Sequence, residues 1–199
     1  MPVAVLTLDQ RRSRGADDAV PALLSTLARD LPAPPLRGFE RTAGDEVQGV
    51  VDDPDTTVEL LARLLRSGGW NLGLGIGEVE HPLPAQTRAG RGEAFLAARE
   101  AVTRAKAEPH RLAVVAATGQ EDATALETVL GLWAGLLERR TEGGWEVYDA
   151  LTEDLTYVEV GERLGISQSA VSQRARAAGI VDEGRARALV SVLCERLLG

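Results

Sequence analysis

Cysteine, histidine and methionine are scarce in this chain. Its 199 residues include one cysteine, two histidines and one methionine. A single cysteine, Cys194, excludes an internal disulfide and cannot by itself build a structural zinc site. The histidines, His81 and His110, stand beside prolines and have no partner at ligand spacing, so we assign no zinc to them. Cys194 lies in an apolar stripe, which indicates a packing role.

Long apolar runs are also missing. The N-terminal run, Met1–Leu8, lacks a basic leader and ends at Asp9, far short of the ~20 residues that cross a bilayer. Hydrophobic residues make up 44% of the chain and charged residues 26%, which is typical of a folded globular protein rather than a disordered one. The sequence therefore predicts a cytoplasmic protein with no membrane segment.

Positive charge is in short supply as well. The formal net charge is -8, which argues at first sight against a nucleic-acid partner, because phosphate groups are neutralised by lysine and arginine. The charge is unevenly spread, since six arginines face five acids between Thr156 and Gly199. A near-neutral part of this kind would hold DNA weakly as one copy and would gain from acting as a pair. This predicts a homodimer.

Strand and helix patterns alternate as far as residue 118. A tight turn at Gly44, Asp45 and Glu46 joins two strands into a hairpin. Glycines at 73, 75 and 77 predict that another backbone or a ligand approaches their strand closely. The order βαββαβ, loop, αβ indicates an α+β fold, with a ferredoxin-like or cyclase-like antiparallel sheet and helices on one face. The expected strands are 2–8, 36–43, 47–51, 70–79 and 111–117, and the expected helices are 16–31, 56–66 and 92–107.

Beyond residue 118 only helices are expected. The range 123–139 has an apolar stripe that contains Trp133, which fits either a cap on the sheet domain or a dimer helix. Helices at 145–151 and 182–198 follow. We therefore expect an α+β domain at 1–118, an amphipathic linker or dimer helix at 119–142, and an all-α domain at 143–199.

The range 156–180, TYVEVGERLGISQSAVSQRARAAGI, has the pattern of a helix-turn-helix. Val160 and Leu164 turn one helix inward, and Gly161 lets a second helix pack closely. Gly165 suits a left-handed turn residue, and Ser167 can cap the second helix. The segment resembles the helix-turn-helix of sigma-factor region four and related bacterial regulators over about 25 residues. A helical hairpin used only for protein contacts is the alternative.

In a helix-turn-helix the second helix lies in the major groove of DNA. Glutamine pairs with adenine and arginine with guanine, so Gln168, Gln173 and Arg176 are the predicted base readers. Arg163 and Arg174 are expected to contact phosphates, and Arg185 is a third candidate. The predicted DNA-binding residues are Ser167, Gln168, Ser169, Ser172, Gln173, Arg174 and Arg176.

The N-terminal part resembles class III nucleotidyl cyclases in three motifs. RTAGDEVQGVV is similar to their hairpin, GLGIGEVE to the following strand, and FLAARE to the helix that ends in alanines and arginine. The SatD-like family of bacterial proteins is more similar still, with its aspartate after the first strand and its GDE(F/V)QG hairpin. This resemblance covers about residues 3–117.

The cyclase resemblance implies roles for individual residues. Asp9 and Asp45 match the two metal-binding aspartates, and Arg99 matches the arginine that stabilises the transition state. Arg41 lies near the place of the base-selecting lysine, so the implied ligand is a nucleotide with magnesium. The cyclase asparagine falls on Phe95, which cannot donate a hydrogen bond. The departure predicts a degenerate cyclase-like domain that either binds a nucleotide or binds nothing and serves as a dimer scaffold. From the residues alone, Asp45 also fits a turn, Asp9 a loop cap and Arg99 an ion pair.

Together these features predict a DNA-binding transcriptional regulator that acts as a dimer. Its cyclase-like domain would sense a nucleotide and position two helix-turn-helix segments. The alternatives are an active, metal-dependent nucleotide-processing enzyme with a DNA-binding tail, and a protein-interaction module that uses neither site.

Overall fold

The computed structural model describes residues 1–11 and 17–199, which form two compact units. The first comprises 1–131 and 189–199, and the second comprises 132–188. Two long helices, α4 (Gln120–Glu138) and α8 (Ile180–Leu198), contribute residues to both. The expected boundaries lay at residues 118 and 142. The boundary between the two units instead falls inside α4, after residue 131, and the end of α8 belongs to the first unit. No described helix is both long enough and apolar enough to span a membrane.

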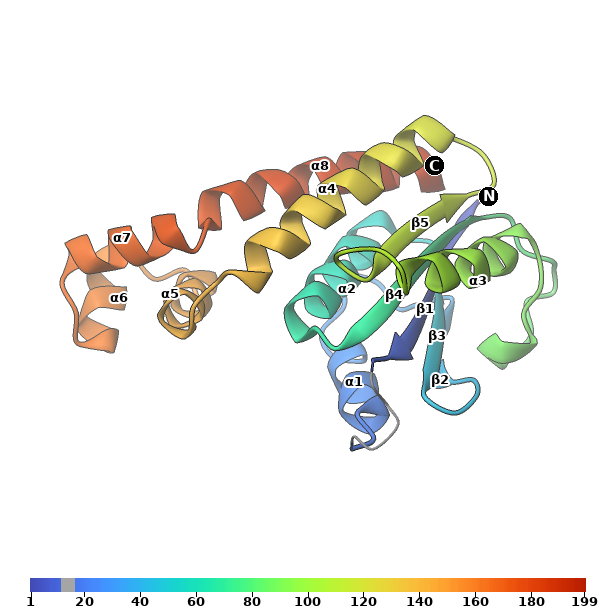
Figure 1. Ribbon diagram of the computed structural model, residues 1–199, viewed down its shortest axis with the longest axis horizontal. Helices are drawn as coiled ribbons and strands as arrows, with labels where there is room; N and C mark the ends of the chain where they lie inside the picture. The colour runs from blue at the N-terminus through green and yellow to red at the C-terminus, as the bar shows by residue number, and fades with distance from the viewer. Residues whose placement is uncertain (12–16) are drawn as a thin grey trace. The chain divides into compact units, whose positions relative to one another are not determined.

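The first unit is built on a five-stranded sheet in the order β2-β3-β1-β4-β5 (Figure 1). β1 pairs antiparallel with both β3 and β4, and β2 pairs antiparallel with β3. The α+β class is confirmed. β5, however, pairs parallel with β4, because a helix crosses over between these two strands and returns the chain to the same end of the sheet. The strands are β1 (Val3–Gln10), β2 (Arg37–Arg41), β3 (Glu46–Val51), β4 (Trp70–Gly77) and β5 (Leu112–Ala116).

Helices cover both faces of this sheet, which corrects the expectation of helices on one face. α3 (Glu93–Ala105) packs over one face, and α1 (Val20–Leu27) and α2 (Pro54–Ser67) lie behind the sheet in Figure 1. Successive residues of a strand point to opposite faces of the sheet. Val5 and Leu6 of β1 are both 0% exposed, so both faces of this strand are covered. α1 is shorter than the expected helix 16–31, and the expected start at Ala16 lies outside the described residues.

The glycines of β4 explain how closely α3 packs on its face of the sheet. A Cβ atom on Gly73 would lie 2.2 Å from the backbone N of Val102, and one on Gly75 would lie 2.1 Å from the backbone N of Ala98. Ordinary side chains cannot occupy such positions. The close approach predicted for this strand is therefore made by the backbone of α3.

The apolar stripe of α4 is buried within the chain. Leu126 and Leu130 are 0% exposed in the first unit, and Trp133 is 1% exposed in the second. Leu126 and Leu130 therefore pack within the first unit, which favours the capping role over the dimer role for these two residues.

The second unit has a small helical core. Its helices are α5 (Glu142–Thr152), α6 (Tyr157–Leu164) and α7 (Gln168–Ala177), together with parts of α4 and α8. The three shorter helices close around a cluster of Val147, Ala150, Val160, Val171 and Ala175. This core fixes the orientation of α7 on α5 and α6.

Candidate nucleic-acid interface

α6 begins with a capping box. The Thr156 hydroxyl accepts a hydrogen bond from the backbone N–H of Glu159, and the Glu159 carboxylate accepts one from the backbone N–H of Thr156 at 2.7 Å. The hydrogen bond from the Thr156 backbone N–H lowers the pKa of the Glu159 carboxyl, and a hydrogen bond from the Thr156 hydroxyl lowers it further. These reciprocal bonds satisfy two donors at the start of α6 and fix its first turn.

The turn between α6 and α7 depends on two glycines, as the sequence predicted. Gly165 has φ +65° and ψ +32°, the left-handed conformation that favours glycine. The backbone N–H of Ile166 donates to the carbonyl of Gly161 at 2.9 Å. A Cβ on Gly161 would lie only 2.8 Å from the Ile166 carbonyl oxygen. A side chain at Gly161 would therefore push the turn away from α6.

α7 starts at a serine cap and is anchored by one buried side. The Ser167 hydroxyl accepts a hydrogen bond from the backbone N–H of Ala170 at 3.2 Å, as expected for a cap. Val171 and Ala175 are 0% and 4% exposed and belong to the unit's core. The opposite side of α7 is therefore left facing solvent.

The predicted reading residues lie together on that exposed side. Gln168 and Ser169 occupy the first turn, followed one turn later by Ser172 and Gln173, and then by Arg176, and all five are exposed. The Arg176 side chain makes no hydrogen bond or ion pair with any described residue. The structure thus presents a continuous polar stripe with a free guanidinium at its end.

The two arginines predicted to contact phosphates are tied to acids. Arg174 lies 3.2 Å from Glu146 of α5, and Arg163 lies 2.5 Å from Glu153. The Arg163 hydrogen bond and charge lower the pKa of the Glu153 carboxyl. Sequence reasoning missed both pairs, because the acids belong to α5 and its C-terminal end, outside the helix-turn-helix motif. Part of the positive charge next to α7 is therefore neutralised within the protein.

A buried arginine, also missed from the sequence, connects α7 to its neighbours. The guanidinium of Arg140 donates from Nε and Nη2 to the carbonyl of Ala178, at 3.0 and 2.8 Å, and pairs with Glu183 at 2.5 Å. It also lies 4.4 Å from the ring centre of Trp145 and 4.6 Å from that of Tyr148. Burial is the main cause that raises the pKa of Tyr148. Arg140 thus joins α5, the end of α7 and the start of α8.

The carboxylates predicted to bind metal lie at one end of the sheet. Asp9 is in register with Glu46 across β1 and β3, which brings it close along the sheet to Asp45. Its carboxylate accepts a hydrogen bond from Asn71 at 3.0 Å and pairs with Lys106 at 3.2 Å. Within residues 1–11 and 17–199, no three His, Cys, Asp or Glu side chains form a group that could hold a metal ion. This geometry gives magnesium no support, and its binding stays a prediction.

The arginines assigned to a nucleotide have separate surroundings. Arg41 pairs with Asp18 at 2.5 Å, which lowers the pKa of that carboxyl, and donates to the carbonyl of Gly44 at 2.8 Å. Arg99 lines a cavity of about 70 Å³ together with Thr42, and Arg41 is not among the residues that line it. The structure therefore does not gather these two arginines around one cavity, and their nucleotide role stays a prediction.

One family model matches the chain. Residues 146–178 match the model described as Sigma-70, region 4, a range that covers part of α5, all of α6 and α7, and the cap residue of α7. The comparisons with curated proteins and with solved structures give no match. The N-terminal likeness to SatD-like proteins and cyclases stays a prediction. The helix-turn-helix of the second unit is thus similar to sigma-70 region 4, in agreement with the resemblance seen in its sequence.

Proposed function

We propose that this protein binds duplex DNA through α7 and regulates transcription. The observation that carries the proposal is the exposed polar stripe on α7, set on a helix-turn-helix that is similar to sigma-70 region 4. The second helix of such a motif enters the major groove, with residues near its N-terminus at the base edges. In this proposal Gln168 and Gln173 pair with adenine and Arg176 pairs with guanine.

Phosphate contacts would come from arginines beside the stripe. Arg174 and Arg163 exchange their glutamate partners for DNA phosphates, and Arg185, which is 79% exposed in its side chain, adds a third contact. Such contacts fix the register of the protein on DNA without reading its sequence. Binding is therefore expected to weaken as salt concentration rises.

A dimer is part of this proposal. Six arginines against five acids between Thr156 and Gly199 give one copy little attraction for DNA, and two linked copies bind far more tightly than one. Sedimentation analysis of the protein with its selected DNA tests this part. A complex with one protein chain per site would contradict it and leave DNA binding itself standing.

The central experiment is selection of duplexes from a genomic library, followed by electrophoretic shift of the selected site and of a random duplex. Replacing Gln173 or Arg176 with alanine lowers the preference for the selected site by ~1–3 kcal/mol per lost pair of bonds. Arg174→Ala weakens both duplexes alike. Arg139→Ala, at an exposed position outside α7, is the control and leaves the preference unchanged.

Equal losses on both duplexes for all three α7 variants would contradict base reading. The absence of any selected duplex would contradict DNA binding altogether. The same assay, repeated with magnesium and nucleoside triphosphates, tests the predicted nucleotide sensing by the first unit. An affinity that is unchanged at saturating nucleotide would contradict that prediction alone.

A further inference from the structure

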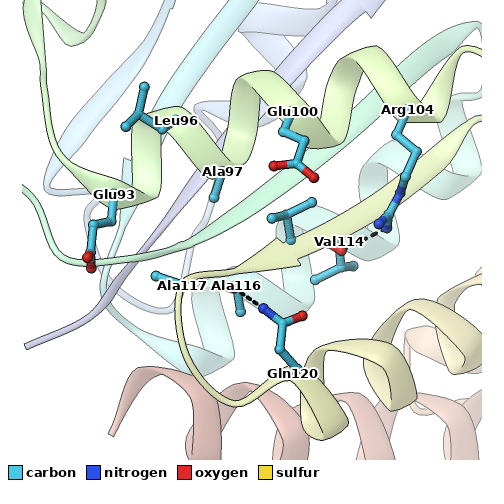
Figure 2. Close-up of a pocket in the computed structure, with 10 residues that line it drawn as sticks. Glu93, Leu96, Ala97, Glu100, Arg104, Val114, Ala116, Ala117 and Gln120 are labelled. Atoms are coloured by element: carbon cyan, nitrogen blue, oxygen red, sulfur yellow. Dashed lines mark hydrogen bonds between the residues drawn. The ribbon is translucent and has the colours of Figure 1, made fainter.

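Two cavities flank α3 in the first unit, and they differ in how their polar groups are satisfied. The cavity between α3 and β5, of about 350 Å³, is shown in Figure 2. There Arg104 donates to the carbonyl of Val114 at 2.8 Å and pairs with Glu127, and Gln120 donates to the carbonyl of Ala116 at 2.5 Å. The arginine and the glutamine of this cavity are thus already bonded within the protein.

The second cavity, of about 700 Å³, has free arginines instead. Arg88, Arg91 and Arg99 all line it. None of the three guanidinium groups forms an ion pair with a described residue, and Arg88 Nε makes one bond, to Gln86 at 3.2 Å. This volume is within the range of small-molecule sites. The contrast with the first cavity indicates donors that are available to a ligand.

The backbone that carries these arginines is held in place. Thr87, in the 3₁₀ helix η1 (Thr87–Ala89), is 2% exposed and donates to the carbonyl of Gly38 at 3.1 Å. The backbone N–H of Arg88 donates to the Glu40 carboxylate at 3.0 Å. Arg99 belongs to α3, which packs closely on β4. Binding therefore does not have to order the main chain that presents Arg88 and Arg99, which reduces its cost.

The same cavity has an apolar wall. Phe95 and Leu96 of α3 line it, and Leu96, which also borders the cavity in Figure 2, is 67% exposed. A large apolar side chain at this exposure, next to three unpaired guanidinium groups, suits a ligand with a charged end and an apolar body. Glu80 and Glu93 also line the cavity, and they would repel a second anionic group.

We propose that this cavity binds a small molecule with one oxyanion group, a phosphate or a carboxylate, attached to an apolar body. The oxyanion lies at Arg88 and Arg99, because these two arginines also line the adjoining polar cavity, where they outnumber its one acid, Glu46. The Glu46 carboxylate already accepts a hydrogen bond from the Thr42 hydroxyl at 2.6 Å. Guanidinium groups bind both oxyanions through paired hydrogen bonds. The apolar body lies against Leu96.

The test is a titration of the full-length protein with phenyl phosphate, benzoate and inorganic phosphate, followed through the backbone amide signals of Gly90 and Gly92. At least one of the first two probes gives saturable shifts at these signals, and inorganic phosphate binds more weakly. Arg99→Gln and Arg88→Gln each lower the affinity by about tenfold, the size expected for a charged hydrogen bond. Leu96→Ser weakens the aromatic probe and leaves inorganic phosphate unchanged. Arg29→Gln, at an exposed arginine outside the cavity, is the control and has no effect.

Phenyl phosphate and benzoate distinguish the two oxyanions, because the tighter of them identifies the group that the cavity accepts. Binding that is equal in wild type, Arg99→Gln and Arg88→Gln would overturn the proposal. A loss of duplex DNA affinity in these variants, with no binding of any probe, would assign the arginines to DNA and would also overturn it. DNA binding through α7 is measured separately and does not depend on this result.

Discussion

Arg140 and Glu183 form a salt bridge in the interior of the second unit. Their side chains are 0% and 5% exposed, and Arg140 Nη2 lies 2.5 Å from Glu183 Oε2. The same guanidinium holds the carbonyl of Ala178, at the C-terminal cap of α7. One side chain therefore connects the end of the proposed reading helix to the first turn of α8.

Arg140→Leu is expected to destabilise the protein strongly. It leaves the buried Glu183 carboxylate without its cationic partner and the Ala178 carbonyl without its guanidinium donors, and breaking a buried pair in this way costs about 3–5 kcal/mol. Urea unfolding monitored by tryptophan fluorescence measures the loss. The double variant Arg140→Leu, Glu183→Leu should be more stable than Arg140→Leu alone, because no charge stays buried.

The control for this change is Arg185→Leu. Arg185 and Asp182 form an exposed pair, with side chains 79% and 71% exposed, and such pairs contribute ~1 kcal/mol at most. A cost for Arg140→Leu no larger than that of Arg185→Leu would contradict the role assigned to the buried pair.

Gly75→Ala is expected to separate α3 from the sheet. The new methyl group would lie 2.1 Å from the backbone N of Ala98, and backbone atoms cannot move aside as a flexible side chain can. The cost should reach or exceed the ~1–3 kcal/mol typical of overpacking. Gly38→Ala, on β2 with no atom within 4 Å of the new methyl group, is the matched control. Thermal unfolding of both variants measures the difference, and equal midpoints would contradict the close packing of α3 on β4.

The fold was predictable where local pattern decides it. Short apolar runs located most of the strands, and the glycines of β4 indicated a close neighbour, since Gly73 and Gly75 leave no side chain on one face. The face that α3 covers was not predictable, because a pattern of small residues does not say whether the approaching group is a helix or a ligand. The parallel pairing of β5 was missed for a similar reason, since strand direction depends on the path of α3 through space.

The candidate site was also predictable only where residues close in sequence determine the structure. The caps, the turn glycines and the exposed stripe of α7 follow from residues close in sequence. The pairs that restrain the arginines do not, because Glu146 is far along the chain from Arg174, and Glu183 is farther still from Arg140. An arginine in a sequence carries no sign of whether it will face solvent, as Arg176 does, or be buried against two aromatic rings, as Arg140 is.

Cys194 is expected to be unreactive in the folded protein. It is 0% exposed, and burial raises the pKa of its thiol from the ordinary value of 9.0 to about 12. At pH 8 almost no thiolate is present, and the thiolate is the reactive form. A colourimetric disulfide reagent should therefore react only as fast as the protein unfolds, and at once in concentrated urea, which is the control. Immediate reaction without urea would contradict the burial.

The same shift has a consequence for stability at alkaline pH. Above about pH 9 the unfolded chain loses the thiol proton, while the folded protein keeps it until about pH 12. The unfolded state then binds fewer protons, so this thiol lowers the free energy of unfolding as pH rises through that interval. Cys194→Ala should flatten the decline, as urea unfolding between pH 8 and 10 would show. An equally steep decline in wild type and Cys194→Ala would contradict the shift.

Glu146→Gln is expected to strengthen DNA binding by releasing Arg174. The pair, with N–O distance 3.2 Å and side chains 40% and 50% exposed, must open before the guanidinium can reach a phosphate. Exposed pairs of this kind are worth about 0.2–1 kcal/mol, which corresponds to a gain of about one-and-a-half- to fivefold on any duplex. Electrophoretic shift with the selected and the random duplex measures the gain, and because phosphates carry no sequence information both duplexes should gain equally.

Removing any negative charge near α7 also raises DNA affinity, so the control must have the same charge change without the pair. Glu142→Gln provides it, because Glu142 is exposed on the same helix, one turn before Glu146, and makes no ion pair with a described residue. The excess of the Glu146→Gln gain over the Glu142→Gln gain isolates the release of Arg174. In an Arg174→Ala background this excess should vanish. If it persists there, Glu146 acts on DNA through its charge alone and the exchange of partners is wrong.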